Sequence, residues 1–300
     1  MVQGNTNTGD TMNKSYLMMA SALLIVVAGA YVMQRKKGMI DFDISMRIAE
    51  HPHLLENQMY AELYSTFKKL YEKNYVAQVP KDAPYKIPKI LHQIWLGSPF
   101  PEKYAALRDT WLKNHPDWQY MLWTEKEIDE FGLTNREMYD YAVNYGERSD
   151  IAKYEIIYRY GGVYIDVPDY ECYKPLDDVH KAYDFYLGIQ PLDTGHVQIG
   201  LGLFGARPGH PLLAQAIEKI SEKQKVAEPV VLRTGPFFFT IIFYKMAPHC
   251  TDKVIALPAS FLYPMGYHEK VKDKAKWYRP EALANHLWAG SWLTDEAFVK

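Results

Sequence analysis

Two carboxylates three residues apart, Asp166 and Asp169, are the side chains of this sequence best suited to chemistry. Carboxylate oxygens are hard ligands of the kind that Mg²⁺ and Mn²⁺ take in proteins. A divalent cation held there would neutralise the charge that develops on a diphosphate leaving group, without any proton transfer. A bare D-x-x-D spacing is far more often a solvated acidic turn, so the surrounding sequence decides between these interpretations.

The segment before the acidic pair predicts how the pair is positioned. Ser149 is a plausible helix N-cap, the next eleven residues suit a helix, and Gly161-Gly162 would end it. Residues 163–165 then have the pattern of a short strand, which places the acidic pair at a carboxyl strand end. Ligands of open α/β sheets bind outside such strand ends, so the position favours a functional role.

Apolar runs and helical patterns alternate upstream of this segment. The expected elements are a buried strand within 87–97, a helix at about 104–114, a strand at 118–123 and a helix from Thr124, which would form a capping box with Glu127. This alternation predicts an α/β fold. A chain of 300 residues with 48% hydrophobic content can bury one sizeable core, so a single catalytic domain is expected at 80–300.

The N-terminal part of the chain predicts a membrane anchor. After a tail at 1–14, residues 15–33 carry no charge and are nearly long enough to span a bilayer. A signal peptide or a buried helix is the alternative interpretation of this run. Arg35, Lys36 and Lys37 follow the span, so the positive-inside rule places the catalytic domain in the cytosol, with the Golgi or ER lumen as the alternative.

A stem with an amphipathic helix is expected at 34–79. Apolar residues recur there every four positions, at Leu55, Met59, Leu63 and Phe67. Such a stripe usually packs on the neighbouring domain. Because Lys68, Lys69 and Lys73 lie near one end, an interfacial membrane helix is the other interpretation.

Composition excludes several classes of function. The formal net charge is -2 and no long basic stripe is present, so nucleic acid is not an expected partner. The two cysteines, Cys172 and Cys250, are too few for a disulfide framework and do not have zinc-ligand spacing. Their scarcity favours a reducing compartment.

The stretch from residue 87 to about 292 resembles the DXD-containing glycosyltransferases of family 32. That family includes initiating α-1,6-mannosyltransferases, inositol-phosphoceramide mannosyltransferases and bacterial capsule or lipopolysaccharide sugar transferases. The matching motifs are I-P-K-I-L-H-Q-I-W at 87–95, R-S-D at 148–150, Y-G-G-V-Y-I-D at 160–166, D-Y-E-C at 169–172, K-P-L-D at 174–177, P-G-H-P at 208–211, T-G-P at 234–236, Y-P at 263–264 and H-L-W-A-G-S-W at 286–292. Their order over some two hundred residues makes the resemblance specific.

The resemblance implies a Rossmann-like GT-A fold, a nucleotide diphosphate sugar as donor, and transfer with retention of anomeric configuration. It also implies roles for individual residues. His92, Gln93 and Trp95 would line the nucleoside pocket, Asp150 with Lys153 would contact the donor ribose or sugar, Asp166, Asp169 and His286 would bind Mn²⁺ or Mg²⁺, and Ser291 and Trp292 would close the site on the diphosphate.

The chain departs from the family pattern at two positions. Pro168 stands between the paired acids as if inserted, which bears on the geometry of the metal ligands. Lys153 occupies a position where the family often has Arg, and an ammonium group offers a charge but no bidentate fork.

The resemblance implies a retaining, metal-dependent transferase that moves a hexose, with mannose or galactose favoured, from a GDP- or UDP-sugar to a glycan or lipid acceptor. The scheme is front-face displacement, in which positioning and charge stabilisation dominate. A non-catalytic protein that binds nucleotide sugars or glycans on the same fold is the alternative. A metal hydrolase ranks last, because no second acidic cluster is evident.

Overall fold

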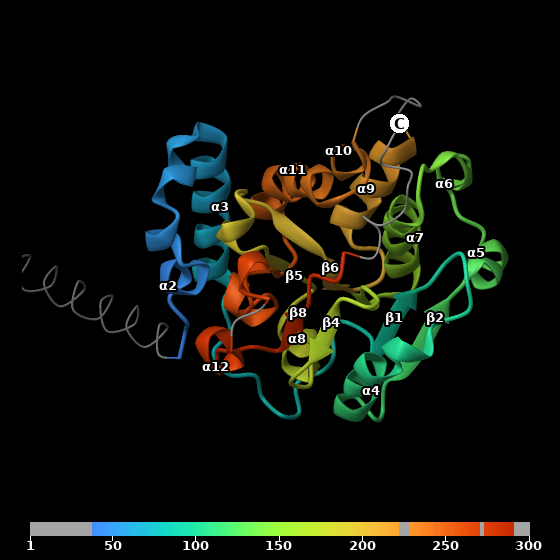
Figure 1. The fold of residues 1–300 in the computed structure, drawn as a ribbon, viewed down its shortest axis with the longest axis horizontal. Helices are drawn as coiled ribbons and strands as arrows, with labels where there is room; N and C mark the ends of the chain where they lie inside the picture. Colours follow the sequence, from blue (N-terminus) through green and yellow to red (C-terminus); the bar gives the residue numbers. More distant parts are fainter. Residues whose placement is uncertain (1–37, 222–228, 271–272, 291–300) are drawn as a thin grey trace, which may run out of the picture. The chain divides into compact units, whose positions relative to one another are not determined.

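The computed structural model describes residues 38–221, 229–270 and 273–290. The predicted anchor at 15–33 therefore lies outside the described residues. Ile40–Tyr75 and the chain from Val79 onward form one compact unit, and the account below concerns this unit. Figure 1 shows its strands in the middle, with helices on either side.

The core of this unit is a six-stranded sheet in the order β2-β1-β3-β6-β5-β7. The strands are β1 (Ile90–Ile94), β2 (Gln119–Trp123), β3 (Gly162–Ile165), β5 (Phe185–Ile189), β6 (Ile199–Ala206) and β7 (Val254–Leu257). β6 is antiparallel to both of its neighbours, whereas the pairs β1–β2, β1–β3 and β5–β7 are parallel. The predicted α/β fold is confirmed, with a mixed sheet.

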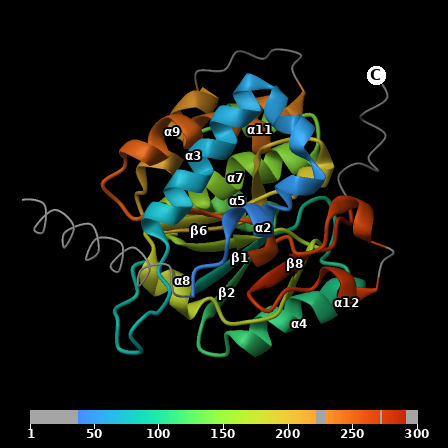
Figure 2. The same cartoon turned by 90° about the vertical axis from the view of Figure 1, so that its left-hand side faces the viewer.

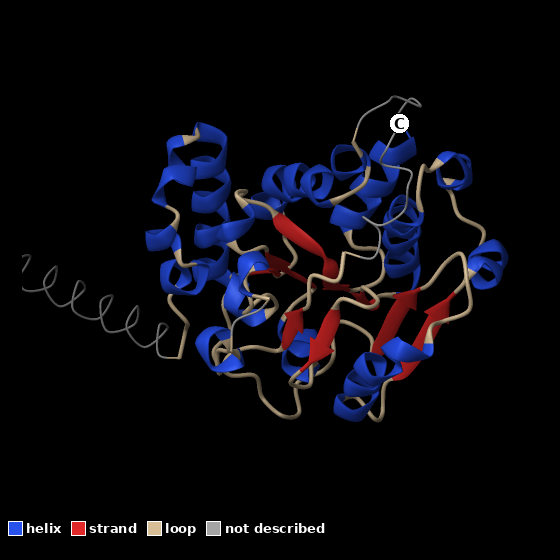
Figure 3. Ribbon diagram, in the orientation of Figure 1, coloured by secondary structure: helices blue, strands red, loops and turns tan. Residues whose placement is uncertain are grey.

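Helices cover both faces of this sheet (Figures 2 and 3). The α-helices are α2 (Phe42–Met46), α3 (Gln58–Asn74), α4 (Ala105–Asn114), α5 (Glu125–Phe131), α6 (Arg136–Tyr141), α7 (Tyr145–Tyr160), α8 (Asp177–Ala182), α9 (Pro211–Ser221), α10 (Val230–Arg233), α11 (Pro236–Met246) and α12 (Lys274–Trp277). α7, α9 and α11 lie on one face, and α4 and α8 lie on the other. A second sheet pairs β4 (Tyr170–Cys172) with β8 (Ala284–His286).

Local sequence signals account for most of these elements. Thr124 and Glu127 form the predicted capping box at the start of α5. Gly161 ends α7, as predicted, with a positive φ of 65°. The predicted start of α7 was wrong, because Asn144 rather than Ser149 is its N-cap and accepts a hydrogen bond from the Glu147 amide.

The amphipathic helix expected in the stem is α3, and it is part of the compact unit. Its buried face contains Leu63, Phe67 and Leu70, whereas Met59 of the predicted stripe is 41% exposed. The Phe67 ring contacts Phe243 of α11 at 5.8 Å between centroids. The stripe thus packs on the neighbouring elements, which was the first of its two interpretations.

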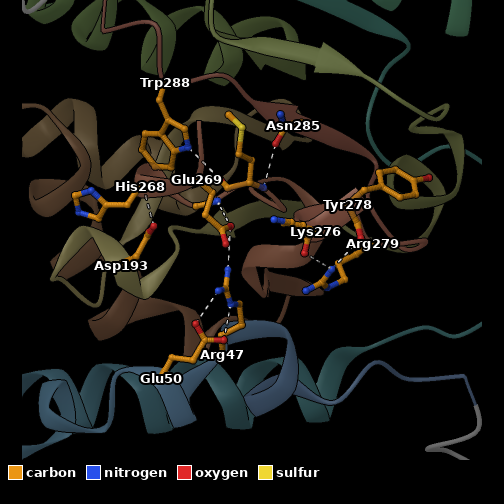
Figure 4. Close-up of polar contacts among 12 residues, drawn as sticks. Arg47, Glu50, Asp193, His268, Glu269, Lys276, Tyr278, Arg279, Asn285 and Trp288 are labelled. Carbon is orange, nitrogen blue, oxygen red and sulfur yellow. Dashed lines mark hydrogen bonds and ion pairs between the residues drawn. The ribbon is translucent and has the colours of Figure 1, made fainter. Parts of the chain in front are cut away.

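Polar contacts also join the short helix α2 to the C-terminal half of the unit. Arg47, just after α2, pairs with Glu50 at 2.6 Å and with the buried Glu269 at 2.9 Å, as Figure 4 shows. Ser45 and Ser260 share a buried hydrogen bond of 2.6 Å. Residues 40–75 therefore complete the core of this unit.

Among the described residues, the stretch Val230–His249 is long and apolar enough to cross a membrane. Half of it is buried, and Thr234 and Gly235 separate α10 from α11 within it. The Phe239 ring stacks on Tyr154 of α7 at 5.3 Å. These contacts are typical of a core helix in a globular unit.

Candidate functional site

The sheet has a topological switch point between β1 and β3. The chain passes from β1 to β2 on one side and returns to place β3 on the other side of β1. Ligands of open α/β sheets bind in the crevice that forms outside the carboxyl ends of such strands. Trp95 and Gly97 follow β1 at this edge and Asp166 follows β3, so these three residues lie at the same end of neighbouring strands.

Asp166 is held rigidly at the end of β3. Its backbone amide donates to the Gly202 carbonyl at 2.7 Å, and its Oδ1 accepts from the Tyr164 hydroxyl at 2.5 Å. Gly202 leaves room for this carboxylate, because a Cβ at that position would lie 2.8 Å from Asp166 Oδ2. Asp166 as a whole residue is partly exposed, although burial dominates the environment of its carboxyl group.

Helix α7 and the start of α11 add a polar cluster beside Asp166. Ser149 Oγ lies 2.9 Å from the Tyr164 hydroxyl. Lys153 Nζ pairs with Asp150 Oδ1 at 2.6 Å and lies 4.8 Å from the centre of the Tyr164 ring. The Thr234 hydroxyl donates to Asp150 Oδ2 at 3.2 Å. Three motifs that are far apart in the sequence, at 148–150, 164–166 and 234–236, thus meet in one place.

The site carries more negative than positive charge. Burial raises the pKa of Asp150 to about 6, opposed by Lys153 and reinforced by Asp166. Burial also raises the pKa of Asp166, again opposed by Lys153 and reinforced by the charge of Asp169. Lys153 and Lys270, the second of which acts on Asp169, supply fewer positive charges than these three carboxylates carry, and a bound cation would relieve the imbalance.

Asp169 organises the backbone that follows β8. It is 5% exposed, and its Oδ1 accepts from the Ala289 amide at 2.7 Å. Its carbonyl accepts from the Leu287 amide at 2.6 Å. Burial raises the pKa of Asp169, while the Ala289 and Gly290 amides oppose that shift. Pro168 lies in the turn between the two acids, and its peptide bond with Val167 is cis.

His286 lies on β8 directly opposite Tyr170 of β4. Its Nε2 is 3.9 Å from Asp169 Oδ1, and its Nδ1 accepts from the Trp288 amide at 3.2 Å. Burial lowers the pKa of His286 to about 3, so the ring is neutral. An accepting Nδ1 assigns the proton to Nε2, which makes Nε2 a hydrogen-bond donor toward the acidic pair, and the role of His286 as a metal ligand stays a prediction.

Trp288 fixes the path of the chain after His286. Its φ is 56°, a left-handed conformation that a bulky residue seldom adopts. Its indole Nε1 donates to the Met265 carbonyl at 3.0 Å (Figure 4), and its own carbonyl accepts from Lys270 Nζ at 2.6 Å. These contacts hold the turn that brings the next amide, Ala289, onto Asp169.

Asp166 and Asp169 suit a divalent cation that is coordinated partly by the protein and partly by oxygens of the bound substrate. Among residues 38–221, 229–270 and 273–290, no three or more His, Cys, Asp or Glu side chains form a ready cage for a metal ion. Mg²⁺ is commonly bound through one or two carboxylates together with phosphate oxygens and water. Asp166 and Asp169, with their mutual repulsion and excess negative charge, meet that requirement.

The residues predicted for the nucleoside pocket lie at different depths. His92 is fully buried, with Nε2 at 2.9 Å from the Gly161 carbonyl and Nδ1 accepting from Trp123 Nε1 at 3.0 Å. Burial lowers its pKa to about 4. Gln93 is also buried and accepts from the Tyr120 hydroxyl at 2.9 Å. Both ring nitrogens of His92 are thus used inside the protein.

Trp95 is the member of that group at the crevice. It is half-buried, and its Nε1 donates to Ser98 Oγ at 3.1 Å. Ser291 and Trp292, which were predicted to close the site on the diphosphate, lie outside the described residues.

Sequence reasoning missed several residues that shape the site. Tyr164 shares a face of β3 with Asp166, and the two-residue repeat of a strand could have indicated this. Thr234 belongs to a motif that was noticed but given no role. Gly202 and the contact of Ser149 with Tyr164 depend on pairing between distant segments, for which the sequence carries no local signal.

Comparisons with known proteins agree with this geometry. Residues 101–186 match the family model described as "Glycosyltransferase sugar-binding region containing DXD motif". Inositol phosphoceramide mannosyltransferase 1 of Schizosaccharomyces pombe is 32% identical over 228 residues, which are 71% of this chain and 65% of that protein. A mannosyl phosphorylinositol ceramide synthase of Saccharomyces cerevisiae is 28% identical over 225 residues, 68% of this chain and 57% of that protein.

A more distant relative is the initiation-specific alpha-1,6-mannosyltransferase of Candida albicans, 23% identical over 298 residues, with 73% of this chain and 75% of that protein covered. The chain spans less than two thirds of the length of the two inositol phospholipid enzymes above. Among solved structures, PaToxG Glycosyltransferase matches with a TM-score of 0.47 and 18% identity, covering 64% of this chain and 80% of that chain. At this level the structural match adds nothing to the assignment.

Proposed function

Because this chain carries the DXD-containing sugar-binding region of a glycosyltransferase family, we propose that it transfers a hexose from a nucleotide diphosphate sugar to a lipid or glycan acceptor. Mannose is the favoured hexose, since the relatives named above are mannosyltransferases by name. The mixed sheet with its switch point between β1 and β3 fits the Rossmann-like GT-A fold.

The observation that carries this proposal is the place of Asp166. It is a partly exposed residue at the carboxyl end of a central strand, its carboxylate fixed by Tyr164 and Gly202, in a site with an excess of negative charge. Asp166 and Asp169 would hold a divalent cation, which when bound neutralises charge on the diphosphate.

The side chains around the acidic pair would orient the donor. Lys153 presents its ammonium group between Asp150 and Asp166 and helps to balance the anionic donor. The Nε2–H of His286 can donate to a diphosphate oxygen. The Asp150 carboxylate, held by Lys153 and Thr234, can accept from donor hydroxyls. These fixed groups lower the barrier because they need no reorganisation during the reaction.

In the chemical step, an acceptor hydroxyl attacks the anomeric carbon on the face from which the diphosphate leaves. The new glycosidic C–O bond forms, the bond between sugar and phosphate breaks, and the leaving phosphate oxygen takes the hydroxyl proton. No protein nucleophile is required. Burial raises the pKa of the nearby Cys172 thiol to about 12, which argues against such a role for it.

Release of nucleoside diphosphate from a panel of GDP- and UDP-sugars by the detergent-solubilised full chain tests the proposal. We expect release from one donor with Mn²⁺ and none with chelator. Asp166→Asn should lower the rate by roughly 100-fold or more, as loss of a preorganised charge does. Asp140→Asn is the matched control, because Asp140 is an exposed carboxylate that pairs with Arg136.

Three outcomes are distinguishable. Full activity in Asp166→Asn would exclude the assigned role of that carboxylate. Donor binding without release, even with acceptors added, would favour a non-catalytic sugar-nucleotide binding protein. Failure to bind any of the donors would overturn the proposed function.

A further inference from the structure

Tyr145 is a large aromatic side chain exposed at the beginning of α7. It is the first residue of that helix, directly after the N-cap Asn144, whose side chain accepts from the Glu147 amide at 2.8 Å. The Tyr145 side chain is 44% exposed. The cap fixes the backbone here, so the ring projects from a rigid position.

The periodicity of α7 places Tyr145 in line with the site. Ser149 and Lys153 follow at the fourth and eighth positions, so the three side chains share one helix face. Ser149 and Lys153 both contact Tyr164 of β3, next to Asp166. Tyr145 therefore lies one helical turn, about 5.4 Å, further out along this face, at the mouth of the crevice.

The loop after β1 reaches this ring from the other side. Gly97 has a φ of +84°, and a Cβ built on it would lie 2.5 Å from Cζ of the Tyr145 ring. The Tyr145 ring thus lies so close to the backbone at position 97 that only a glycine fits there. Arg148, one helical turn on, is 5.8 Å from the ring centre. Tyr145 consequently connects α7 with the β1 loop across the switch-point crevice.

We propose that the base of the nucleotide donor stacks on the Tyr145 ring, and that the absence of a side chain at Gly97 leaves the space in which this ring lies. This inference rests on the proposed function, since it needs a nucleotide in the crevice. The Arg148 guanidinium lies over one face of this part-exposed ring, so a base would stack on the opposite face, and the diphosphate would then extend inward toward Lys153 and Asp166. Stacking of a base on an aromatic side chain contributes binding with little dependence on which base is present.

Nucleotide affinity of the full chain, without turnover, tests this inference. The probes are GDP and UDP with Mn²⁺, and inorganic pyrophosphate, which has the diphosphate but no base. Tyr145→Ala should weaken binding of the nucleoside diphosphates by about 5-fold to 150-fold, the range for loss of one stacked base. Pyrophosphate affinity should not change. Tyr145→Phe keeps the ring and should bind the nucleotides as the wild type does.

Tyr158→Ala is the matched control, because Tyr158 is on the same helix and 38% exposed but lies near its other end. It should leave all three affinities unchanged. Equal weakening of nucleotide and pyrophosphate binding by Tyr145→Ala would assign Tyr145 a structural role and overturn the inference. Unchanged nucleotide binding in that variant would overturn it as well. If the wild type binds neither nucleotide, the proposed function itself fails.

Discussion

At the scale of single residues, the balance of charge around Lys153 decides how the site responds to pH. Its ammonium group opposes the burial that raises the pKa values of Asp150 and Asp166. The pKa of Asp150 is about 6 even with this cation present. Protonation of these carboxylates would remove the charge that the proposed donor and cation sites require, so activity should decline on the acid side of neutrality.

Replacing Lys153 by Met should move that acid limb of the pH–rate profile to higher pH. Without the ammonium group, both carboxylates become harder to ionise, so kcat/KM should fall more at pH 6.5 than at pH 8.5. A carboxyl pKa raised in the folded state gives stability that is present at low pH and lost as pH rises through that pKa. The Met variant should therefore be destabilised more at pH 8 than at pH 5.

The pH–rate profile and thermal unfolding at both pH values measure these two effects. Lys153→Arg is the control, because it keeps the positive charge and should leave the acid limb in place. An acid limb at the same pH in the wild type and Lys153→Met would show that Lys153 does not tune these carboxylates.

Single residues also show which features of the site the sequence could predict and which it could not. Asp150, Lys153 and Asp166, to which the resemblance gave roles in donor or metal binding, are neighbours in the structure, because each motif lies at a strand end or on the helix facing it. It grouped His92 with the nucleoside pocket, but this ring is buried with both nitrogens engaged. A buried histidine and a ligand-lining histidine have the same local sequence, and the packing that separates them is tertiary.

At the scale of elements, two glycines of strand β6 leave space for side chains of the site and of the core. Gly202 faces Asp166 and Tyr170, and Gly205, three residues on, faces the Tyr186 ring. Added Cβ atoms would lie 2.8 Å from Asp166 Oδ2 and 2.3 Å from the Tyr186 ring. Since three residues along a strand reverse the face, one glycine serves the site and the other serves the core on the opposite face.

Gly202→Ala and Gly205→Ala should therefore separate activity from stability. Both variants crowd a packed strand, and each should lower the free energy of unfolding by about 1–3 kcal/mol. Gly202→Ala should also lower kcat by roughly tenfold or more, because it displaces the Asp166 carboxylate from its position. Gly205→Ala should retain the wild-type kcat for each folded molecule. The concentration of folded protein is to be measured by a method that does not depend on the active site. Equal kcat values in the two variants would contradict the role given to Gly202.

The elements themselves were largely predictable. Strands β1, β2 and β3 appear within one to three residues of their expected places, because short apolar runs between Pro and Gly permit few alternatives. The start of α7 was misplaced by five residues, since Asn144 and Ser149 are both good caps and only the observed side-chain contact decides between them. The antiparallel direction of β6 depends on chain topology, for which no sequence signal was available.

At the scale of the whole molecule, buried neutral histidines couple the fold to pH. Burial lowers the pKa values of four histidines outside the proposed site, to about 4 for His92 and His210, to about 3 for His180, and in the same direction for His115. Their rings lie in the core, where His180, for example, contacts the Ile87 carbonyl and the Tyr186 hydroxyl.

These histidines should make the fold labile to mild acid. A histidine with a depressed folded-state pKa binds its proton only when the chain unfolds, so the unfolded state takes up more protons between about pH 6.5 and 4. Asp150, Asp166 and Asp169 have the opposite effect, since their raised pKa values make the folded state bind protons first. The four histidines outnumber these three carboxyl groups, so we expect the free energy of unfolding to fall as the pH is lowered below about 6.

Urea unfolding of the full chain between pH 7.5 and 4.5 measures this dependence, and His210→Gln provides its sharpest check. His210 is fully buried, its Nε2 has no hydrogen-bond partner within the described residues, and it lies 3.5 Å from Asp252. A glutamine there cannot titrate, so the pH slope of stability should fall by about one proton, or ~1.4 kcal/mol per pH unit, whatever the variant does to stability at pH 7.5. An unchanged slope would mean that His210 is already able to bind its proton in the folded state, through the nearby Asp252 carboxylate, and that the acid lability must arise from other groups.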